Sequence, residues 1–505
     1  MSRPAVVGVV GAGVMGAGIA QLFAAAGSAV RLFDTFEGAA EKARVGVAGR
    51  FARLAEKGRL DPAEADAASE RVSVVDELAG LAGCELLVEA VVEDLEIKQS
   101  LFASLEALCG PETVLASNTS SLQISEIAAR CERPERFAGL HFFNPVPLMK
   151  VVEVIPGVHT DPQVVDTLCR WVVQTGHQPV VAADRPGFIV NHAGRGFITE
   201  GLRIVDEGVA DVVDVDRVMR EAGGFRLGPF ELLDLTGLDV SGKVMTSVYE
   251  QFFHEPRFRP SASTAPRVAA GLFGRKTGAG FYRYPEGRQE VPEERTAPLV
   301  TLTRVWLEPP NDSADPLAAL LVNGGAELVA QPDDAELCVL RPLGRDATSS
   351  ASALGLDLAR CVAIDTLTAD PGRLTLMLTV STVPAVRDAA HGLLASGGTP
   401  VTVINDSPGF VLQRTLATIV NIGCELVQQR IATPSDLDKA VKLGLGYPFG
   451  PLAFGDQIGP ERILTVLRNL LHETGDPRYR PSRWLTRRVA AGLSLLAPDA
   501  PRSAG

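Results

Sequence analysis

A histidine and a glutamate in neighbouring apolar runs are the residues of this sequence best suited to acid–base chemistry. Glu153 lies within Val151–Ile155 among valine and isoleucine, and His141 lies twelve residues earlier in another apolar run. Burying a carboxylate among such side chains is costly unless the carboxylate is paired. We expect His141 to be the partner, because such a pair orients the imidazole and raises its basicity for general-base catalysis. A purely structural ion pair is the alternative.

Further polar residues follow apolar runs that we predict to be strands. The carboxyl ends of parallel strands meet at the edge where ligands bind in open α/β sheets. We therefore expect these polar groups to face one site. The predicted strands cover Leu86–Glu93, Val114–Ser117 and Phe137–Pro145, the last with His141 at its exit.

Four polar side chains near these runs could contact a ligand. Ser120 and Asn191 can donate hydrogen bonds to a substrate oxygen, although a turn serine and a helix-capping asparagine are the structural alternatives. Glu93, at the end of its predicted strand, and Lys98 could reach the ribose and the charge near a cofactor.

Residues 6–34 carry the pattern of a dinucleotide site. The pattern contains a strand (Val6–Val10), a glycine turn (Gly11, Ala12, Gly13, Val14, Met15 and Gly16), a helix (Ala17–Ala26), a second strand (Ala29–Phe33) and Asp34. Glycines let the backbone approach a pyrophosphate, whose charge sits at the helix N-terminus, while the acid accepts hydrogen bonds from ribose hydroxyls. The carboxylate of Asp34 would repel a 2′-phosphate, which favours NAD over NADP.

Composition limits the remaining alternatives. The 505 residues are 46% hydrophobic and 22% charged, as in a globular protein, and the net charge of −13 argues against nucleic-acid binding. The uncharged stretch 5–30 contains six glycines as well as Gln21 and Ser28, so we predict no membrane span and no signal peptide. Seven scattered cysteines without a CxxC pair favour a reduced, cytoplasmic protein with no metal site.

An internal repeat organises the chain. Asp184-x-Pro-Gly-Phe recurs as Asp406-x-Pro-Gly-Phe, an offset of 222 that also relates Asp214-x-Asp to Asp436-x-Asp. We predict an α/β Rossmann-type domain and an all-α domain, followed by a degenerate repeat of both. The predicted boundaries are 1–183 (NAD-binding), 184–285 (helical), 286–404 (degenerate Rossmann-like) and 405–505 (second helical domain).

The second copy lacks the chemistry of the first. Leu321–Glu327, which we take to follow its first strand, contains no GxGxxG. The offset places Ala363, Thr375 and Gln413 at the positions of the histidine, the glutamate and the asparagine. We expect the second half to serve as a scaffold.

The ordered motifs GAGVMG, VEAVVE, SNTSS, HFFNP, VVEV and PGFIVN resemble the 3-hydroxyacyl-CoA dehydrogenase family, closely over residues 1 to 285. The resemblance implies His141 as catalytic base, Glu153 as its partner, and Ser120 and Asn191 as contacts of the substrate oxygen. It further implies NAD contacts from the glycine turn and from Asp34, Glu93, Lys98, Asn118, Ser120, Asn144 and Lys276. His192 departs from the arginine common in the family, and its role stays open.

The implied reaction is NAD-dependent oxidation of an L-3-hydroxyacyl-CoA, or its reverse, as in fatty-acid β-oxidation or phenylacetate breakdown. A dehydrogenase of a free hydroxy acid or sugar acid, similar to gulonate dehydrogenases, is the nearest alternative. A non-catalytic dinucleotide-binding protein is a more remote one. The implied partner is an acyl-CoA, with no nucleic acid and no membrane. An intrachain pseudo-dimer of the two helical domains and a homo-oligomer both remain open.

Overall fold

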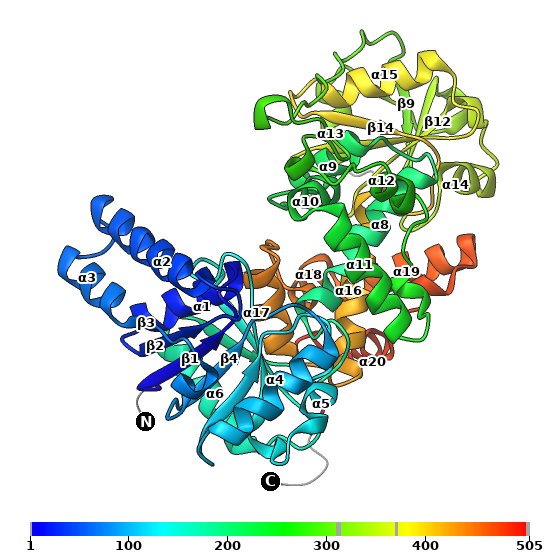
Figure 1. Cartoon of the computed structure of the whole chain (residues 1–505). Coiled ribbons are helices and arrows are strands. Elements are labelled where there is room, and N and C mark those ends of the chain that lie inside the picture. Colours follow the sequence, from blue (N-terminus) through cyan, green and yellow to red (C-terminus); the bar gives the residue numbers. More distant parts are fainter. Residues whose placement is uncertain (1–2, 310–314, 369–371, 501–505) are drawn as a thin grey trace. The chain divides into compact units, whose positions relative to one another are not determined.

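The computed structural model describes residues 3–309, 315–368 and 372–500 (Figure 1), so the outermost residues of the first and fourth predicted domains lie outside the described part. The chain divides into two compact units. The first comprises Met1–His192 with Gln429–Leu445, and the second comprises Ala193–Gln428 with Gly446–Gly505.

The described residues of the first unit form one eight-stranded sheet in the order β3-β2-β1-β4-β5-β6-β7-β8. Neighbouring strands are parallel except β6 and β7, which are antiparallel. Continuous apolar runs form the central strands, as expected where helices cover both faces. The strands are β1 (Val6–Val10), β2 (Ala29–Phe33), β3 (Val72–Val74), β4 (Leu86–Glu89), β5 (Val114–Ser117), β6 (Phe137–Phe142), β7 (Val151–Pro156) and β8 (Gln178–Val181).

Helices of the first unit bury apolar side chains against this sheet. Ile19, Phe23 and Phe51 belong to one core cluster with strand residues such as Val9 and Val88. The helices are α1 (Val14–Ala25), α2 (Ala39–Glu56), α3 (Pro62–Glu70), α4 (Leu95–Leu108), α5 (Ile124–Ile127), α6 (Pro162–Gln174), α7 (Val190–Ala193, ending in the second unit) and α17 (Pro434–Gly444).

The predicted strands at 6–10, 29–33 and 114–117 are confirmed to the residue. The strand predicted over Leu86–Glu93 is wrong at its end: β4 stops at Glu89, because the Glu89 carboxylate accepts a hydrogen bond from Val91 N at 2.7 Å and turns the chain. The helix predicted from Ala17 begins at Val14, because the chain is already helical there and Gly13, its N-cap, has extended backbone angles.

The second unit contains a further α/β sheet, as the predicted degenerate repeat requires. Its described residues form six strands in the order β10-β9-β11-β12-β13-β14, with β12 and β13 antiparallel. The strands are β9 (Arg304–Leu307), β10 (Glu327–Leu328), β11 (Leu337–Leu340), β12 (Cys361–Ile364), β13 (Leu374–Leu378) and β14 (Val401–Ile404). The helices are α8 (Arg195–Asp206), α9 (Val212–Glu221), α10 (Pro229–Thr236), α11 (Leu238–Gln251), α12 (Thr264–Ala269), α13 (Pro316–Asn323), α14 (Ala347–Ala353), α15 (Pro384–Ala395), α16 (Leu412–Gln428), α18 (Pro451–Ile458), α19 (Pro460–Thr474) and α20 (Arg483–Ala491).

Three sequence expectations need correction here. The apolar periodicity of Phe188–Asp206 predicts one long helix, but the helix is broken at Gly194 into α7 and α8. The sequence also predicts Asp214 as the cap of a short helix over Val215–Ala222, but Asp211 occupies the N-cap of α9. The segment Leu321–Glu327 closes helix α13 rather than following the first strand, because that strand, β9, begins earlier at Arg304. Residues 308–315, which do follow β9, contain no glycine.

Helices α8 and α16, which the repeat makes equivalent, pack against each other within the second unit. A Cβ atom at Gly196 would lie 3.3 Å from Thr418, the residue 222 positions later. The rings of Phe225 and Tyr447, related by the same offset, stand 4.9 Å apart. Residues that contact their own counterparts mark a local two-fold relation between the two helical parts.

Candidate functional site

The glycine turn after β1 forms a close backbone crossing that only glycine fits. Gly11 has φ +99°, and a Cβ there would lie 2.5 Å from Ala90 O. A Cβ at Gly16 would lie 1.8 Å from Gly11 O. Around Gly13, in contrast, nothing lies within 4 Å of the corresponding position. The turn is therefore tight toward the protein and open on the side where a ligand would approach.

No acidic or capping side chain accepts hydrogen bonds from the N–H groups at the N-terminus of α1. Gly13 is the N-cap without a side-chain hydrogen bond, and no acidic residue lies in the first turn. The first N–H groups of a helix have no intrahelical acceptors and carry the positive end of its dipole. This end of the 12-residue helix suits an anionic group such as a pyrophosphate.

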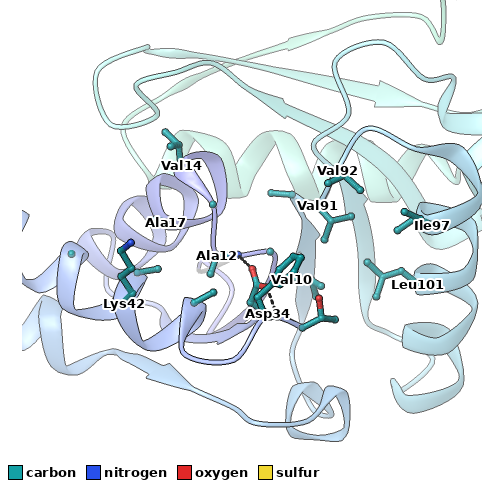
Figure 2. Close-up of a pocket in the computed structure, with 18 of the residues that line it drawn as sticks. Val10, Ala12, Val14, Ala17, Asp34, Lys42, Val91, Val92, Ile97 and Leu101 are labelled. Carbon is teal, nitrogen blue, oxygen red and sulfur yellow. Dashed lines mark hydrogen bonds between the residues drawn. The ribbon is translucent and has the colours of Figure 1, made fainter. Parts of the chain in front are cut away.

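A cavity of about 1110 Å³ opens beside this turn (Figure 2). Asp34 follows β2 and accepts hydrogen bonds from Ala12 N at 2.7 Å and Phe36 N at 2.9 Å. A carboxylate has lone pairs left for two ribose hydroxyls. Val91, Val92, Ile97 and Leu101 supply apolar walls, and the turn Gly11–Val14, Asp34, Lys42 and Arg50 also line the cavity. These residues fit a dinucleotide.

Lys98 and Glu93 are part of a charge network that the sequence did not reveal, in which Lys98 and Glu89 are buried and Glu93 is exposed. The Lys98 ammonium is 2.5 Å from Glu89 and 3.3 Å from Glu93, and Lys98 and Glu89 are almost inaccessible. Partial desolvation alone would raise the pKa of Glu93, but Lys98 and hydrogen bonds from Thr119, Ser120 and Ser121 outweigh it and lower that pKa. Glu93 therefore anchors the loop after β5, and a contact of either residue with NAD stays a prediction.

His141 and Glu153 lie opposite each other on the antiparallel strands β6 and β7. Glu153 Oε2 is 2.6 Å from His141 Nδ1, and the glutamate is fully buried while 5% of the histidine surface is exposed. The other carboxylate oxygen, Oε1, accepts hydrogen bonds from Ile189 N and Val190 N, both at 2.9 Å. The pairing directs the hydrogen of Nδ1 to the carboxylate, which leaves Nε2 as the basic ring nitrogen.

A turn with unusual backbone angles presents those two N–H groups. Gly187 and Phe188 have φ values of +74° and +45°, and α7 follows directly. The Phe188 ring stands 5.8 Å from the His141 ring, and Phe143 packs on the imidazole at 4.4 Å. A positive φ in phenylalanine is strained and persists only where surrounding contacts hold it. The turn thus fixes the carboxylate, and through it the imidazole.

The remaining predicted site residues divide between the two units. Asn191 Nδ2 reaches Ser120 O at 3.5 Å, which joins the loop after β5 to α7. Asn118 Oδ1 accepts from Phe142 N at 2.8 Å and ties the same loop to β6. Lys276 belongs to the second unit, where it pairs with Asp239 at 2.5 Å.

A second cavity of about 620 Å³ in the first unit was not predicted from the sequence. Asn144 and Leu148 line one side. The other side carries Arg50, Arg53, Lys57 and Arg59, from α2 and the residues after it. Arg50 and Arg53, three residues apart, lie on one face of α2, and Lys57 is the C-cap of that helix, so the sequence contained a signal for this basic cluster. In a chain of net charge −13, these four cations form a local basic patch that could hold an anionic ligand.

Among the described residues, no three histidine, cysteine, aspartate or glutamate side chains cluster so that they could hold a metal ion. The helices within the described ranges include none that is both long and apolar enough to cross a bilayer.

Comparisons with known proteins agree with this geometry. The family described as "3-hydroxyacyl-CoA dehydrogenase, NAD binding domain" matches residues 6–185, and "3-hydroxyacyl-CoA dehydrogenase, C-terminal domain" matches 187–284 and again 409–495. The 3-hydroxyadipyl-CoA dehydrogenase of Escherichia coli K12 is 38% identical over 96% of this chain and 97% of its own length. Hydroxyacyl-coenzyme A dehydrogenase from Sus scrofa mitochondria is 40% identical over 55% of this chain and 90% of its own.

A crystal structure titled 3-hydroxybutyryl-CoA dehydrogenase, also from E. coli K12, is similar in fold and in length. It has a TM-score of 0.85 and 35% identity, and the match covers 97% of this chain and 99% of that one.

Proposed function

Because the chain belongs to the 3-hydroxyacyl-CoA dehydrogenase family, we propose that it oxidises an L-3-hydroxyacyl-CoA to the 3-ketoacyl-CoA, or catalyses the reverse reaction. One observation carries this proposal: the imidazole of His141 is held at 2.6 Å by the buried Glu153, in the unit that contains the dinucleotide cavity.

NAD is the cofactor that the residues around the cavity would hold. The open N-terminus of α1 would receive the pyrophosphate, and Asp34 would accept from the adenosine ribose. When bound, NAD supplies the acceptor for the hydride that leaves C3 of the substrate. Asp34 would repel the 2′-phosphate of NADP, although Lys42 in the same cavity would partly offset this.

His141 would act as the general base. Its Nε2 takes the proton of the C3 hydroxyl, while the C3 hydrogen leaves with its electron pair as hydride, so a carbonyl forms. Glu153 stabilises the resulting imidazolium through Nδ1 and keeps the ring in place through its two backbone donors. In the reverse direction the imidazolium returns the proton to the developing alkoxide.

Ser120 and Asn191 would hold the substrate oxygen as charge develops on it. The 3.5 Å contact between them joins the loop after β5 to α7. Donors that are fixed before the reaction stabilise a developing charge without reorganisation. Asn118, Asn144 and Lys276 remain proposed NAD contacts alongside Glu93 and Lys98.

The basic cavity beside Asn144 would receive the phosphates of coenzyme A. Four cations line about 620 Å³ there, which suits a ligand with several phosphate charges. This favours a thioester substrate over a free hydroxy acid. The names of the two E. coli relatives make 3-hydroxybutyryl and 3-hydroxyadipyl thioesters the first acyl groups to try.

We propose that the two helical parts form a pseudo-dimer within one chain. The buried Arg414 of α16 binds Glu200 of α8 at 2.8 Å, next to the self-contacting pairs described above.

None of the seven cysteines, all within the described ranges, is disulfide-bonded, which supports the proposed cytoplasmic location.

Absorbance of NADH at neutral pH tests the function. The chain should reduce NAD with L-3-hydroxybutyryl-CoA or 3-hydroxyadipyl-CoA and leave free 3-hydroxybutyrate unreacted. Turnover of the free acid at a similar kcat/KM would support the hydroxy-acid alternative. NADH binding without turnover of any thioester would support a non-catalytic protein.

A further inference from the structure

Residues 429–445 belong to the repeated second half of the sequence but to the first compact unit of the structure. Helix α17 within this segment packs against β7, the strand that carries Glu153, and against β8. Its N-terminus is fixed by Thr433, whose Oγ1 accepts a hydrogen bond from Asp436 N at 3.1 Å. Just before it, Ile431 O accepts from Ala183 N at 2.8 Å and so anchors the segment beyond the end of β8.

The last residue of α17, Gly444, lies directly against α7 and β7. A Cβ atom at Gly444 would lie 2.9 Å from Val190 Cγ2, 3.2 Å from Val190 Cγ1 and 3.3 Å from Val151 Cγ1. Val190 and Val151 are 1% and 0% exposed, so neither side chain has room to yield. Valine is also branched at Cβ and stiff at χ1. The helix can sit this close only because position 444 has no side chain.

Val190 connects this contact to the proposed reaction centre. Its N–H donates to Glu153 Oε1 at 2.9 Å, and Glu153 Oε2 binds His141 Nδ1 at 2.6 Å. We propose that Gly444 is a positioning residue that determines the geometry of the His141–Glu153 pair through Val190. It comes from the second half of the sequence, for which we otherwise propose no chemistry. This inference rests on the proposed function, because it concerns the same pair.

A small displacement at this position has a measurable consequence. A misplacement of about 1 Å at a reacting group costs about 100-fold in rate, and a few tenths of an ångström costs correspondingly less. In the full-length chain, Gly444→Ala should lower kcat with L-3-hydroxybutyryl-CoA about tenfold and Gly444→Val about 100-fold. The KM for substrate and the Kd for NADH should stay within about twofold, since no residue of α17 lines either of the two cavities proposed to bind them.

Two readouts separate positioning from stability. Alanine favours a helix over glycine, which partly offsets the strain of the added methyl group, so Gly444→Ala should lower Tm by only a few degrees while kcat falls about tenfold. The acidic limb of the kcat/KM pH profile should move in Gly444→Ala and stay in place in Lys442→Ala, a control at an exposed position of the same helix. Removing the obstructing methyl groups with Val190→Ala should restore most of kcat to Gly444→Ala.

The possible outcomes are distinct. If wild-type chain turns over neither 3-hydroxybutyryl-CoA nor 3-hydroxyadipyl-CoA, the proposed function is wrong whatever Gly444 does. If wild-type chain is active and both Gly444 variants bind NADH and retain kcat within about twofold, the role of Gly444 is overturned and the proposed function stands. A kcat loss in Gly444→Ala that persists unchanged with Val190→Ala would overturn the path through Val190.

Discussion

The two α/β domains of this chain differ at the N-terminus of the helix that follows the first strand, which is α1 in one domain and α13 in the other. In the first, the N-cap of α1 is Gly13, which has no side-chain hydrogen bond and open space around it. In the second, Asp315 caps α13 by accepting from Leu317 N at 3.0 Å, and its other oxygen binds Arg341 at 2.6 Å. The second domain thus holds its own carboxylate where the first is open to a phosphate. A built-in anion thus stands at the position that we propose for the ligand phosphate in the first domain.

The positions equivalent to the His141–Glu153 pair and its surroundings show a similar difference between the two halves. The turn before α7 recurs before α16, with Gly409 and Phe410 at φ values of +77° and +50°. Gln413 donates to Pro342 O at 3.1 Å, the counterpart of the Asn191–Ser120 contact at the 222 offset. At the histidine position, however, Ala363 stands opposite Met377. The repeat preserves the residues that shape the backbone and replaces those proposed to move a proton.

Removing the second half should have the largest effect on the enzyme. Deletion of Pro298–Gly505 removes α16, which covers α8, and α17, which covers β7 and β8. The exposed apolar faces should cause self-association or insolubility. Light scattering after size-exclusion chromatography measures this, with the full chain as control. A soluble monomer with full activity would contradict both the pseudo-dimer and the scaffold role.

Replacing the proposed base should lower the rate without weakening cofactor binding. His141→Ala removes the proton acceptor, so kcat should fall by about two to four orders of magnitude, the usual contribution of a positioned base. His391→Ala, a buried histidine of α15 in the second half, is the matched control and should keep kcat. Fluorescence titration should show wild-type NADH affinity in both. Near-normal turnover in His141→Ala would refute the assignment.

Giving the first half the cap of the second should block the cofactor. Gly13→Asp places a carboxylate where α13 has Asp315, and the space around Gly13 accommodates it. Like charges brought together cost several kcal/mol, so NADH affinity should fall at least about 100-fold. Tm should hold, since aspartate caps a helix at least as well as glycine. Gly110→Asp, in similarly open space, controls for added charge. Unchanged NADH binding in Gly13→Asp would place the pyrophosphate elsewhere.

Local sequence patterns predicted strands of the first domain, but they did not predict side-chain pairs between residues that lie in different elements. The strands at 6–10, 29–33 and 114–117 were predictable because each is an apolar run bounded by glycine or polar residues. The Lys98–Glu89 pair was missed, because nothing in the spacing shows that β4 ends at Glu89 and turns that carboxylate toward α4. Burial of a lysine is decided by packing, which one sequence does not display.

The second half shows where a fixed offset fails. The 222-residue shift predicts Thr375 at the position of the glutamate, but the residue paired with Ala363 is Met377. The offset is 222 at Pro342 and Gln413, but it is 224 at β13 and β14, where Met377 pairs with Ile404 as Glu153 pairs with Val180. Two residues are therefore added between β12 and β13 and lost again between β14 and Gln413. Loop length is free to vary where no side chain has to meet a partner. Register across an antiparallel pair therefore had to come from the structure.

The smallest effect concerns Asp365, a buried carboxyl beside Gln413 in the second half. Burial raises its pKa to about 6 from a usual 3.8, although Gln413 donates to it at 3.0 Å. Because the folded pKa is above the unfolded one, the stabilisation is complete below about pH 4 and is lost as pH rises through about 6. The loss should be of order 3 kcal/mol.

Asp365→Asn should remove this pH dependence. Chemical denaturation should therefore show a smaller change in the free energy of unfolding between pH 5 and pH 8 for the variant than for wild type. Its kcat should match wild type, since the second half has no proposed chemistry. A kcat loss at constant Tm would mean that the second domain still communicates with the reaction.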